Sequence, residues 1–243
     1  KGLEIALVLD NTGSMDDYNK IGSLRTAATE LINILFGAED TPDRLKVSVV
    51  PFSQTVKLNA SLAGSSGWID TNGTSSVAKL NFDDNYYAYT IWPKMKQSSW
   101  AGCVEARPGE YEELDTAPSA STPDTRWVPY FQPDEPDSKS GQPNYPDNYL
   151  YDGMSNSQPV ATRQRNSDKY FNVKTTKPNQ DCNMQEILAL TNVKSTILTR
   201  INGMTASGYT HIAIGLGWGW RTLSPTQPFH QGSAYDDPDW QKA

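Results

Sequence analysis

The sequence predicts an α/β fold: a doubly wound, mostly parallel sheet interrupted by one large insertion. The chain opens on an almost unbroken apolar run at residues 3–9, which is typical of a strand buried on both faces of a parallel sheet. A helix pattern and a second apolar run follow by residue 52, whereas further helix patterns return only after residue 186. We therefore expect a core made of residues 1–52 and 186–243, and an insertion at residues 53–185.

The first core segment is predicted to be a strand, a helix and a second strand. The helix is indicated by apolar residues that recur at spacings of three and four. They are Ile21, Leu24, Ala28, Leu31 and Leu35. Gly37 is expected to end this helix, and residues 45–52 to form the second strand. Such a strand-helix-strand unit is right-handed and belongs to a parallel sheet.

The second core segment is predicted to contain two helices. The first has its apolar face between Val193 and Ile201 and ends at Gly203. The second follows a glycine-containing loop and is indicated by apolar residues at positions 212, 216, 220 and 223. The glycines at 215, 217 and 219 do not have the spacing of a nucleotide-binding turn. We expect them to allow this helix to pack closely against a neighbour.

The insertion is expected to be ordered, because it is rich in aromatic residues as well as prolines, and disordered linkers are poor in aromatics. Its two cysteines, Cys103 and Cys182, lie in polar, loop-like sequence. We predict a disulfide between them, although two free buried thiols are the ordinary alternative in a cytosolic protein. Such a bridge would stabilise the fold by on the order of 4 kcal/mol. It would also indicate an oxidising, extracytoplasmic compartment.

Charge and hydropathy exclude several classes of partner. The formal net charge is −7, which argues against nucleic acid and against anionic membrane surfaces as partners. No apolar run reaches the roughly 20 residues that a membrane-spanning helix needs.

Polar side chains follow the opening strand at the point where it is expected to end. Asp10, Thr12 and Ser14 alternate with Asn11 and Gly13, so a curled loop would bring the three side chains together. Ligands bind beyond the carboxyl ends of strands in such sheets, and one carboxylate with two hydroxyls suits Mg²⁺, or Mn²⁺ or Ca²⁺. The alternative is that Asp10 or Ser14 caps the next helix.

The motif Asp10-x-Thr12-x-Ser14 after a hydrophobic strand resembles the first segment of the metal-ion-dependent adhesion site in von Willebrand factor type A domains, which have a Rossmann-like fold. The resemblance implies that Thr210 adds a further oxygen to the metal, although Thr210 could instead cap the helix that follows it. It also implies that an acidic side chain of a partner protein completes the metal shell. This would make the protein a binding module and not an enzyme.

Other blocks resemble the TadG-like proteins of bacterial tight-adherence (Flp) pilus loci. They are Trp100-Ala-Gly-Cys103, Val128-Pro-Tyr-Phe-Gln-Pro-Asp134 and Trp218-Gly-Trp-Arg221. This resemblance implies a membrane anchor upstream of Lys1, an extracytoplasmic domain, and pilus or envelope components as partners.

One departure from the type A pattern concerns the end of the chain. The family continues into a third core strand that ends in Thr-Asp-Gly, whose aspartate joins the metal shell. Here the sequence reaches Ala243 seemingly just before that strand, and Asp236, Asp237 and Asp239 lie in a turn-like run. We therefore expect the C-terminal part of the sheet to be missing, with an unpaired edge beside the opening strand unless a separate segment completes it.

Three alternatives remain open at this point. The first is a metal-free scaffold that uses the aromatic insertion as a contact surface. The second is a phosphotransferase with Asp10 as nucleophile, resembling the haloacid dehalogenase family, although Thr12 stands where that family has a second aspartate. The third is a Ca²⁺ site made by the acidic residues around 134–137 with Asp147 and Asp152, for which a solvated acidic turn is the preferred interpretation.

Overall fold

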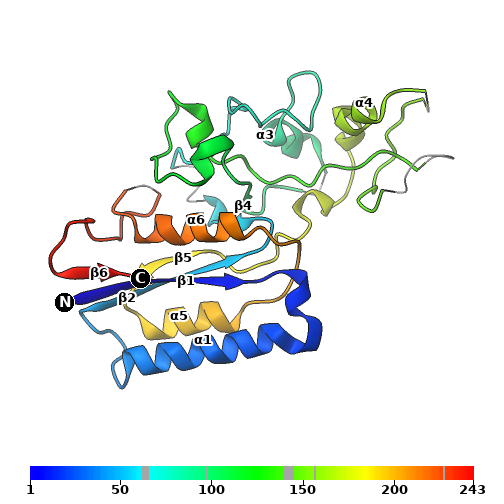
Figure 1. The fold of residues 1–243 in the computed structure, drawn as a ribbon. Coiled ribbons are helices and arrows are strands. Elements are labelled where there is room, and N and C mark those ends of the chain that lie inside the picture. The colour runs from blue at the N-terminus through cyan, green and yellow to red at the C-terminus, as the bar shows by residue number, and fades with distance from the viewer. Residues whose placement is uncertain (62–65, 97, 139–144, 156, 227) are drawn as a thin grey trace.

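The protein is built on a mixed sheet with helices on both faces (Figure 1). The computed structural model describes residues 1–61, 66–96, 98–138, 145–155, 157–226 and 228–243. Within these residues the sheet has four strands in the order β5-β2-β1-β6. They are β1 (Gly2–Asp10), β2 (Leu45–Phe52), β5 (Leu188–Thr191) and β6 (Trp240–Lys242). This confirms the predicted α/β class and the mostly parallel pairing.

Helices α1 (Lys20–Phe36) and α5 (Lys194–Asn202) cover one face of the sheet, and α6 (Ile212–Leu223) covers the other (Figure 1). Helices α1 and α5 coincide with the predicted apolar patterns. Helix α6 forms at the predicted place, but the predicted face is wrong: Ile212, Leu216 and Trp220 are exposed, and the helix packs through Ile214, Trp218 and its glycines instead. Gly37 and Gly203 occupy the C-cap positions of α1 and α5, as expected. Their backbone N–H groups bond to carbonyls of the last helical turn, which satisfies groups that a helix end leaves free.

Strands β1 and β2 run parallel in a register that pairs Leu3 with Leu45 and Asp10 with Phe52. Their carboxyl ends therefore meet at one edge of the sheet. Strand β5 pairs antiparallel with β2 on its far side. Sequence patterns did not predict β5, because a four-residue strand is defined by its partner more than by its own periodicity.

The two faces of the sheet carry separate hydrophobic clusters. Val47 and Val49 of β2 pack toward α1 and α5, whereas Val50 and Phe52 pack toward α6. Helix α6 approaches the sheet through glycines: a Cβ atom on Gly219 would overlap Val8. This confirms the predicted role of the glycines in close packing.

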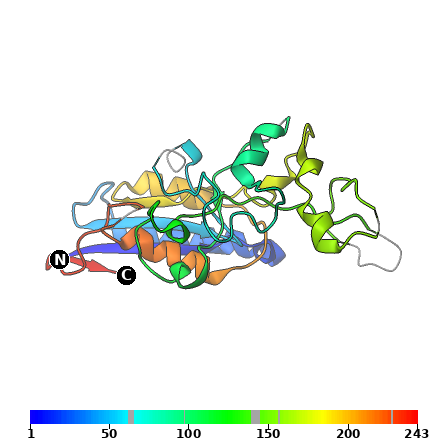
Figure 2. The ribbon, with the colours of Figure 1, turned by 90° about the horizontal axis from the view of Figure 1, so that it is seen from above.

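The described part of the insertion is folded and packs on α6 (Figure 1). Its strands and α-helices in the described residues are β3 (Val56–Lys57), α3 (Ala88–Ile91), β4 (Cys103–Val104) and α4 (Val160–Arg165), joined by loops and short 3-10 helices. The ring of Trp127 lies 4.5 Å from that of Trp218 on α6, in a cluster that both parts of the chain share. A second cluster, around Phe131 and Tyr170, belongs to the insertion alone. Seen from above, the insertion extends past the carboxyl ends of the strands (Figure 2).

The end of the chain differs from expectation. Residues 240–242 do not stop short of the sheet but form β6, which runs parallel to β1 opposite Gly2–Glu4. Glu4 anchors this segment, because its carboxylate accepts hydrogen bonds from Lys242, Lys46 and Ser233. Within the described residues, β6 pairs with β1 only over this short length, and the β1 side chains from Ile5 to Val8 are partly exposed. The expected uncovered edge is therefore confined to the second half of β1.

Candidate metal centre

The loop after β1 brings the three motif residues together. The backbone N–H of Thr12 donates to Asp10 Oδ1 at 2.8 Å. The hydroxyl oxygens of Thr12 and Ser14 lie 3.3 Å apart. The turn is a short 3-10 helix, η1 (Gly13–Met15), which curls the loop back over the end of β1. At the carboxyl edge of the sheet, the two motif hydroxyls thus lie side by side, and the Asp10 carboxylate bonds the backbone of the same turn.

Helix capping does not account for these residues. The N-cap position of α1 is Asn19, which makes no side-chain cap hydrogen bond. Thr12 is the N-cap residue of η1, again without a side-chain cap bond. The capping alternative for Asp10 and Ser14 is therefore wrong.

The spacing of the oxygens suits a small hard cation. Two ligands at adjacent corners of an octahedral Mg²⁺ shell, each about 2.1 Å from the metal, lie about 3 Å apart. The Thr12–Ser14 separation of 3.3 Å is close to this value. Thr12 is buried and Ser14 is exposed, so the site has a rigid inner side and a side open to solvent.

Thr210 lies on a neighbouring loop, which comprises residues 206–211 and leads into α6. This loop is bonded to the Asp10 loop at two points: Gly13 N–H donates to Gly208 O at 2.8 Å, and Ser207 N–H donates to Asn11 O at 2.8 Å. Thr210 is exposed, and no hydrogen bond joins its side chain to the three motif residues in the described part of the chain. His211, not Thr210, is the N-cap residue of α6, so the capping interpretation of Thr210 is also wrong.

The candidate metal ligands carry little negative charge. Among the described residues, no three or more His, Cys, Asp or Glu side chains are arranged to hold a metal ion. A cation at this edge would depend on one carboxylate, Asp10, together with neutral hydroxyls and water. Such a set fits Mg²⁺, which keeps several waters and binds through one or two carboxylates.

The edge also has unused hydrogen-bonding capacity. Asn11 lies between two of the motif residues, is fully buried, and has no hydrogen-bond partner for either side-chain amide atom within the described residues. The hydroxyls of Ser53 and Thr55, just beyond β2, are likewise buried and unpartnered there. Buried polar groups in native proteins are normally bonded to protein or water. These groups are therefore candidates to bind ordered water at this edge of the sheet.

Three contacts from outside the motif fix the 206–211 loop. Asp181 Oδ1 accepts the Ser207 hydroxyl at 2.7 Å, and Gln54 Oε1 accepts the Tyr209 N–H at 2.5 Å. His211 Nε2 lies 3.0 Å from Glu112 Oε1. Sequence reasoning missed these partners, because they come from the insertion or its border and no local pattern marks them.

The acidic residues of the insertion are not a solvated turn, contrary to the preferred interpretation. Asp134 and Asp152 are buried and form ion pairs with Lys169 at 3.0 Å and with Arg163. Their carboxylates also accept backbone N–H groups of residues 149, 150 and 154. Burial raises the pKa of Asp134 even though Lys169 opposes this shift. These residues are committed to holding the insertion together and do not favour a Ca²⁺ site.

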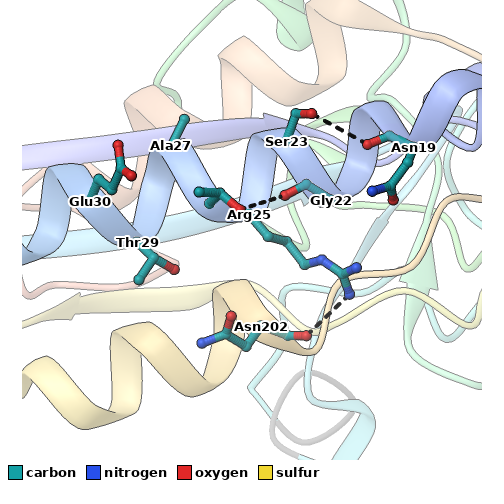
Figure 3. Close-up of a pocket in the computed structure, with 9 residues that line it drawn as sticks. Asn19, Gly22, Ser23, Arg25, Ala27, Thr29, Glu30 and Asn202 are labelled. Carbon is teal, nitrogen blue, oxygen red and sulfur yellow. Dashed lines mark hydrogen bonds between the residues drawn. The ribbon is translucent and has the colours of Figure 1, made fainter.

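A surface groove of about 860 Å³ runs between α1 and α5 (Figure 3). Arg25 lies across it and donates to the carbonyls of Asn202 at 3.5 Å and Met204 at 3.2 Å. The Asn202 carbonyl belongs to the C-terminal end of α5, and the Met204 carbonyl lies just beyond it, so the arginine satisfies groups that the helix end leaves free. The groove is thus explained by helix packing and adds no candidate ligand group.

Comparisons of the chain with protein-family models, with curated proteins and with solved structures gave no match. The class of protein therefore follows from the fold and the site: an α/β domain with a hydroxyl-rich candidate cation site at the carboxyl edge of its sheet. The Cys103–Cys182 disulfide is formed, as predicted, and such bonds are typical of oxidising compartments outside the cytosol. In the described part of the chain, we find no helix with the length and apolar character to span a bilayer.

Proposed function

We propose that the protein is a metal-dependent protein-binding module, in which a divalent cation is held by Asp10, Thr12, Ser14 and Thr210. Mg²⁺ is the preferred ion, with Mn²⁺ or Ca²⁺ as substitutes. The observation that carries this proposal is the turn at the end of β1, in which the Thr12 and Ser14 hydroxyls lie 3.3 Å apart and the Asp10 carboxylate accepts the Thr12 N–H. The bonded contact between this loop and the one that carries Thr210 gives further support.

The donor set explains why the site would bind a carboxylate. Asp10 supplies the single negative charge, and the hydroxyls of Thr12 and Ser14 supply none, so half of the charge on a bound divalent cation stays unneutralised. A bound cation would supply Lewis-acid attraction for an acidic side chain of a partner protein. Ser14 and Thr210 are exposed, so a partner can reach this side of the site. No residue of the loop is assigned a role in bond making or breaking.

The cellular setting is proposed from the disulfide and from the resemblance to TadG-like proteins. A disulfide between insertion residues suits an extracytoplasmic domain. The resemblance points to a domain anchored in the membrane by a segment upstream of Lys1, with pilus or envelope components as partners. Together they suggest a role in pilus assembly or surface attachment.

The partner-carboxylate part of the proposal can be tested with Mn²⁺ as probe and acetate as a minimal carboxylate. Water-proton relaxation counts the exchangeable waters on protein-bound Mn²⁺. We expect acetate to lower this count without releasing the ion. A count that acetate leaves unchanged would contradict an open coordination position. Absence of bound Mn²⁺ would favour the metal-free scaffold instead.

A further inference from the structure

Among the contacts of the insertion with the 206–211 loop, one is a carboxylate that bonds the residue next to the Asp10 loop. Asp181, in the last turn of the insertion, accepts the Ser207 hydroxyl at 2.7 Å. Ser207 lies three positions before Thr210, and its own N–H donates to the carbonyl oxygen of Asn11 in the Asp10 loop. One residue of the 206–211 loop is therefore held from both sides, by the insertion and by the motif loop.

The next residue, Gly208, also contacts both the insertion and the Asp10 loop. Its backbone has a φ of +82°, and an added Cβ would overlap Gln54 Oε1 and lie 3.2 Å from Cβ of Asp181. On its other side, the Gly208 carbonyl accepts the N–H of Gly13 at 2.8 Å. The loop thus has little room to shift while Asp181 stays in place.

Asp181 is itself fixed by its neighbour. Cys182 is buried and bonded to the equally buried Cys103, with a Cα–Cα distance of 5.8 Å. The Cys182 N–H donates to Asn179 O at 3.0 Å, and Asp181 has a φ of +60°, in the left-handed region. Aspartate adopts this region more readily than most residues, so the turn suits the residue that the contact needs.

We propose that Asp181 is a positioning residue for Thr210, which holds the 206–211 loop against the Asp10 loop through Ser207 and so couples the insertion to the candidate metal centre. The effect on metal affinity rests on the proposed function. The effect on the position of the loop does not, because it follows from the contacts alone.

Three variants distinguish a role of Asp181 as a hydrogen-bond acceptor that positions the loop from an effect of its negative charge alone. Ser207→Ala and Asp181→Ala both remove the hydrogen bond, whereas Asp181→Asn keeps an acceptor at the same place and removes the charge. Asparagine also tolerates the left-handed backbone. Ser75→Ala is the matched control, because the Ser75 hydroxyl donates to Asp124 at 2.8 Å in an equivalent bond within the insertion.

The first measurement is amide hydrogen exchange at Gly13 and Tyr209, whose N–H groups bond Gly208 O and Gln54 Oε1. We expect about tenfold faster exchange in Ser207→Ala and Asp181→Ala, since a hydrogen bond to a charged group is lost. Asp181→Asn and Ser75→Ala should exchange like the unmodified chain. Unchanged exchange in Ser207→Ala would overturn the proposal.

The second measurement is Mn²⁺ affinity of the same variants. We expect the dissociation constant to rise three- to tenfold in Ser207→Ala and Asp181→Ala and to stay near the original value in Asp181→Asn. If Asp181→Asn weakens binding as much as Asp181→Ala while Ser207→Ala does not, Asp181 acts by charge and the positioning role is wrong. If the unmodified chain binds no Mn²⁺, the proposed function fails, and the exchange data alone decide the role of Asp181.

Discussion

The backbone N–H of Gly13 donates a 2.8 Å hydrogen bond to the carbonyl oxygen of Gly208. This bond joins the loop after the first strand to the loop before the last helix, which lie at opposite ends of the core sequence. It brings the segment that carries Thr210 up to the Asp10-x-Thr12-x-Ser14 motif.

The first prediction concerns the exposed hydroxyl of the motif. In the described part of the chain, the Ser14 hydroxyl bonds to the Thr12 hydroxyl and to no other side chain, so Ser14→Ala should preserve the fold. We expect the dissociation constant for Mn²⁺ to rise about tenfold, which corresponds to about 1.4 kcal/mol. Calorimetric titration measures this change. Ser23→Ala on the exposed side of α1 is the control, and equal affinities for the two variants would argue against Ser14 as a ligand.

The second prediction concerns the anchor of β6. Burial alone raises the pKa of Glu4, but bonds from Lys242, Lys46 and Ser233 outweigh burial and lower it below the usual 4.5. The ionised form therefore stabilises the fold above pH 4.5, and this contribution is lost as pH falls through the lowered pKa. We expect Glu4→Gln to reduce the unfolding free energy at pH 7 by about 3 kcal/mol, because two lysines lose their partner.

Denaturant titrations of Glu4→Gln at several pH values check this prediction. The difference from the unmodified chain should shrink as the pH is lowered below 4.5. Glu39→Gln, at an exposed glutamate, should show no comparable effect. A Glu4→Gln difference that is the same at pH 7 and at the lowest pH would contradict the account of the anchor.

The third prediction concerns Glu105, whose contribution to stability changes with pH in the opposite direction to that of Glu4. Burial raises the pKa of Glu105 to about 7, although the Phe131 backbone partly opposes this shift. The neutral form is favoured in the folded chain, so its contribution is complete below pH 4.5 and is lost as pH rises through about 7. Glu105→Gln should therefore increase the unfolding free energy at pH 8 by about 1 to 3 kcal/mol and change it little at pH 5. Thermal unfolding at both pH values, with the exposed Glu113→Gln as control, decides whether the gain depends on pH.

The fourth prediction concerns the disulfide. Cys103 and Cys182 close a loop with a sequence separation of 79. We expect the double variant Cys103→Ser, Cys182→Ser to lose on the order of 4 kcal/mol of unfolding free energy, because the unfolded chain is no longer constrained. Urea unfolding of the oxidised and variant chains measures the loss. Unchanged stability would show that the bridge does not hold the insertion.

The sequence predicted the helices and strands whose own residues show a repeating apolar pattern. Strands β1 and β2 and helices α1 and α5 each have a clear apolar pattern, and their observed bounds follow it. Helix α6 was predicted at the right place but with the wrong buried face. Strands β5 and β6 were missed because they are short and exist through pairing with β2 and β1. The disulfide could be predicted because the chain has two cysteines, which leaves one pairing.

The candidate site was predictable in its motif but not in its supports. Asp10, Thr12 and Ser14 are adjacent in sequence, so a single turn brings them together. The bonds from Asp181 and Gln54 depend on how a long insertion folds back over the sheet, which no periodicity encodes. The buried pairs Asp134–Lys169 and Asp152–Arg163 were misjudged for the same reason.

The central claim, that the Asp10 loop binds a divalent cation, is tested most directly by calorimetric titration of Mg²⁺ and Mn²⁺ into the unmodified chain, Asp10→Ala and Asp16→Ala. Asp16 is an exposed carboxylate two positions beyond Ser14, so its variant controls for the loss of one negative charge in the same loop. The account predicts saturable binding to the unmodified chain and to Asp16→Ala, and none to Asp10→Ala. Equal binding by Asp10→Ala and the unmodified chain, or no binding to any of the three, would contradict it.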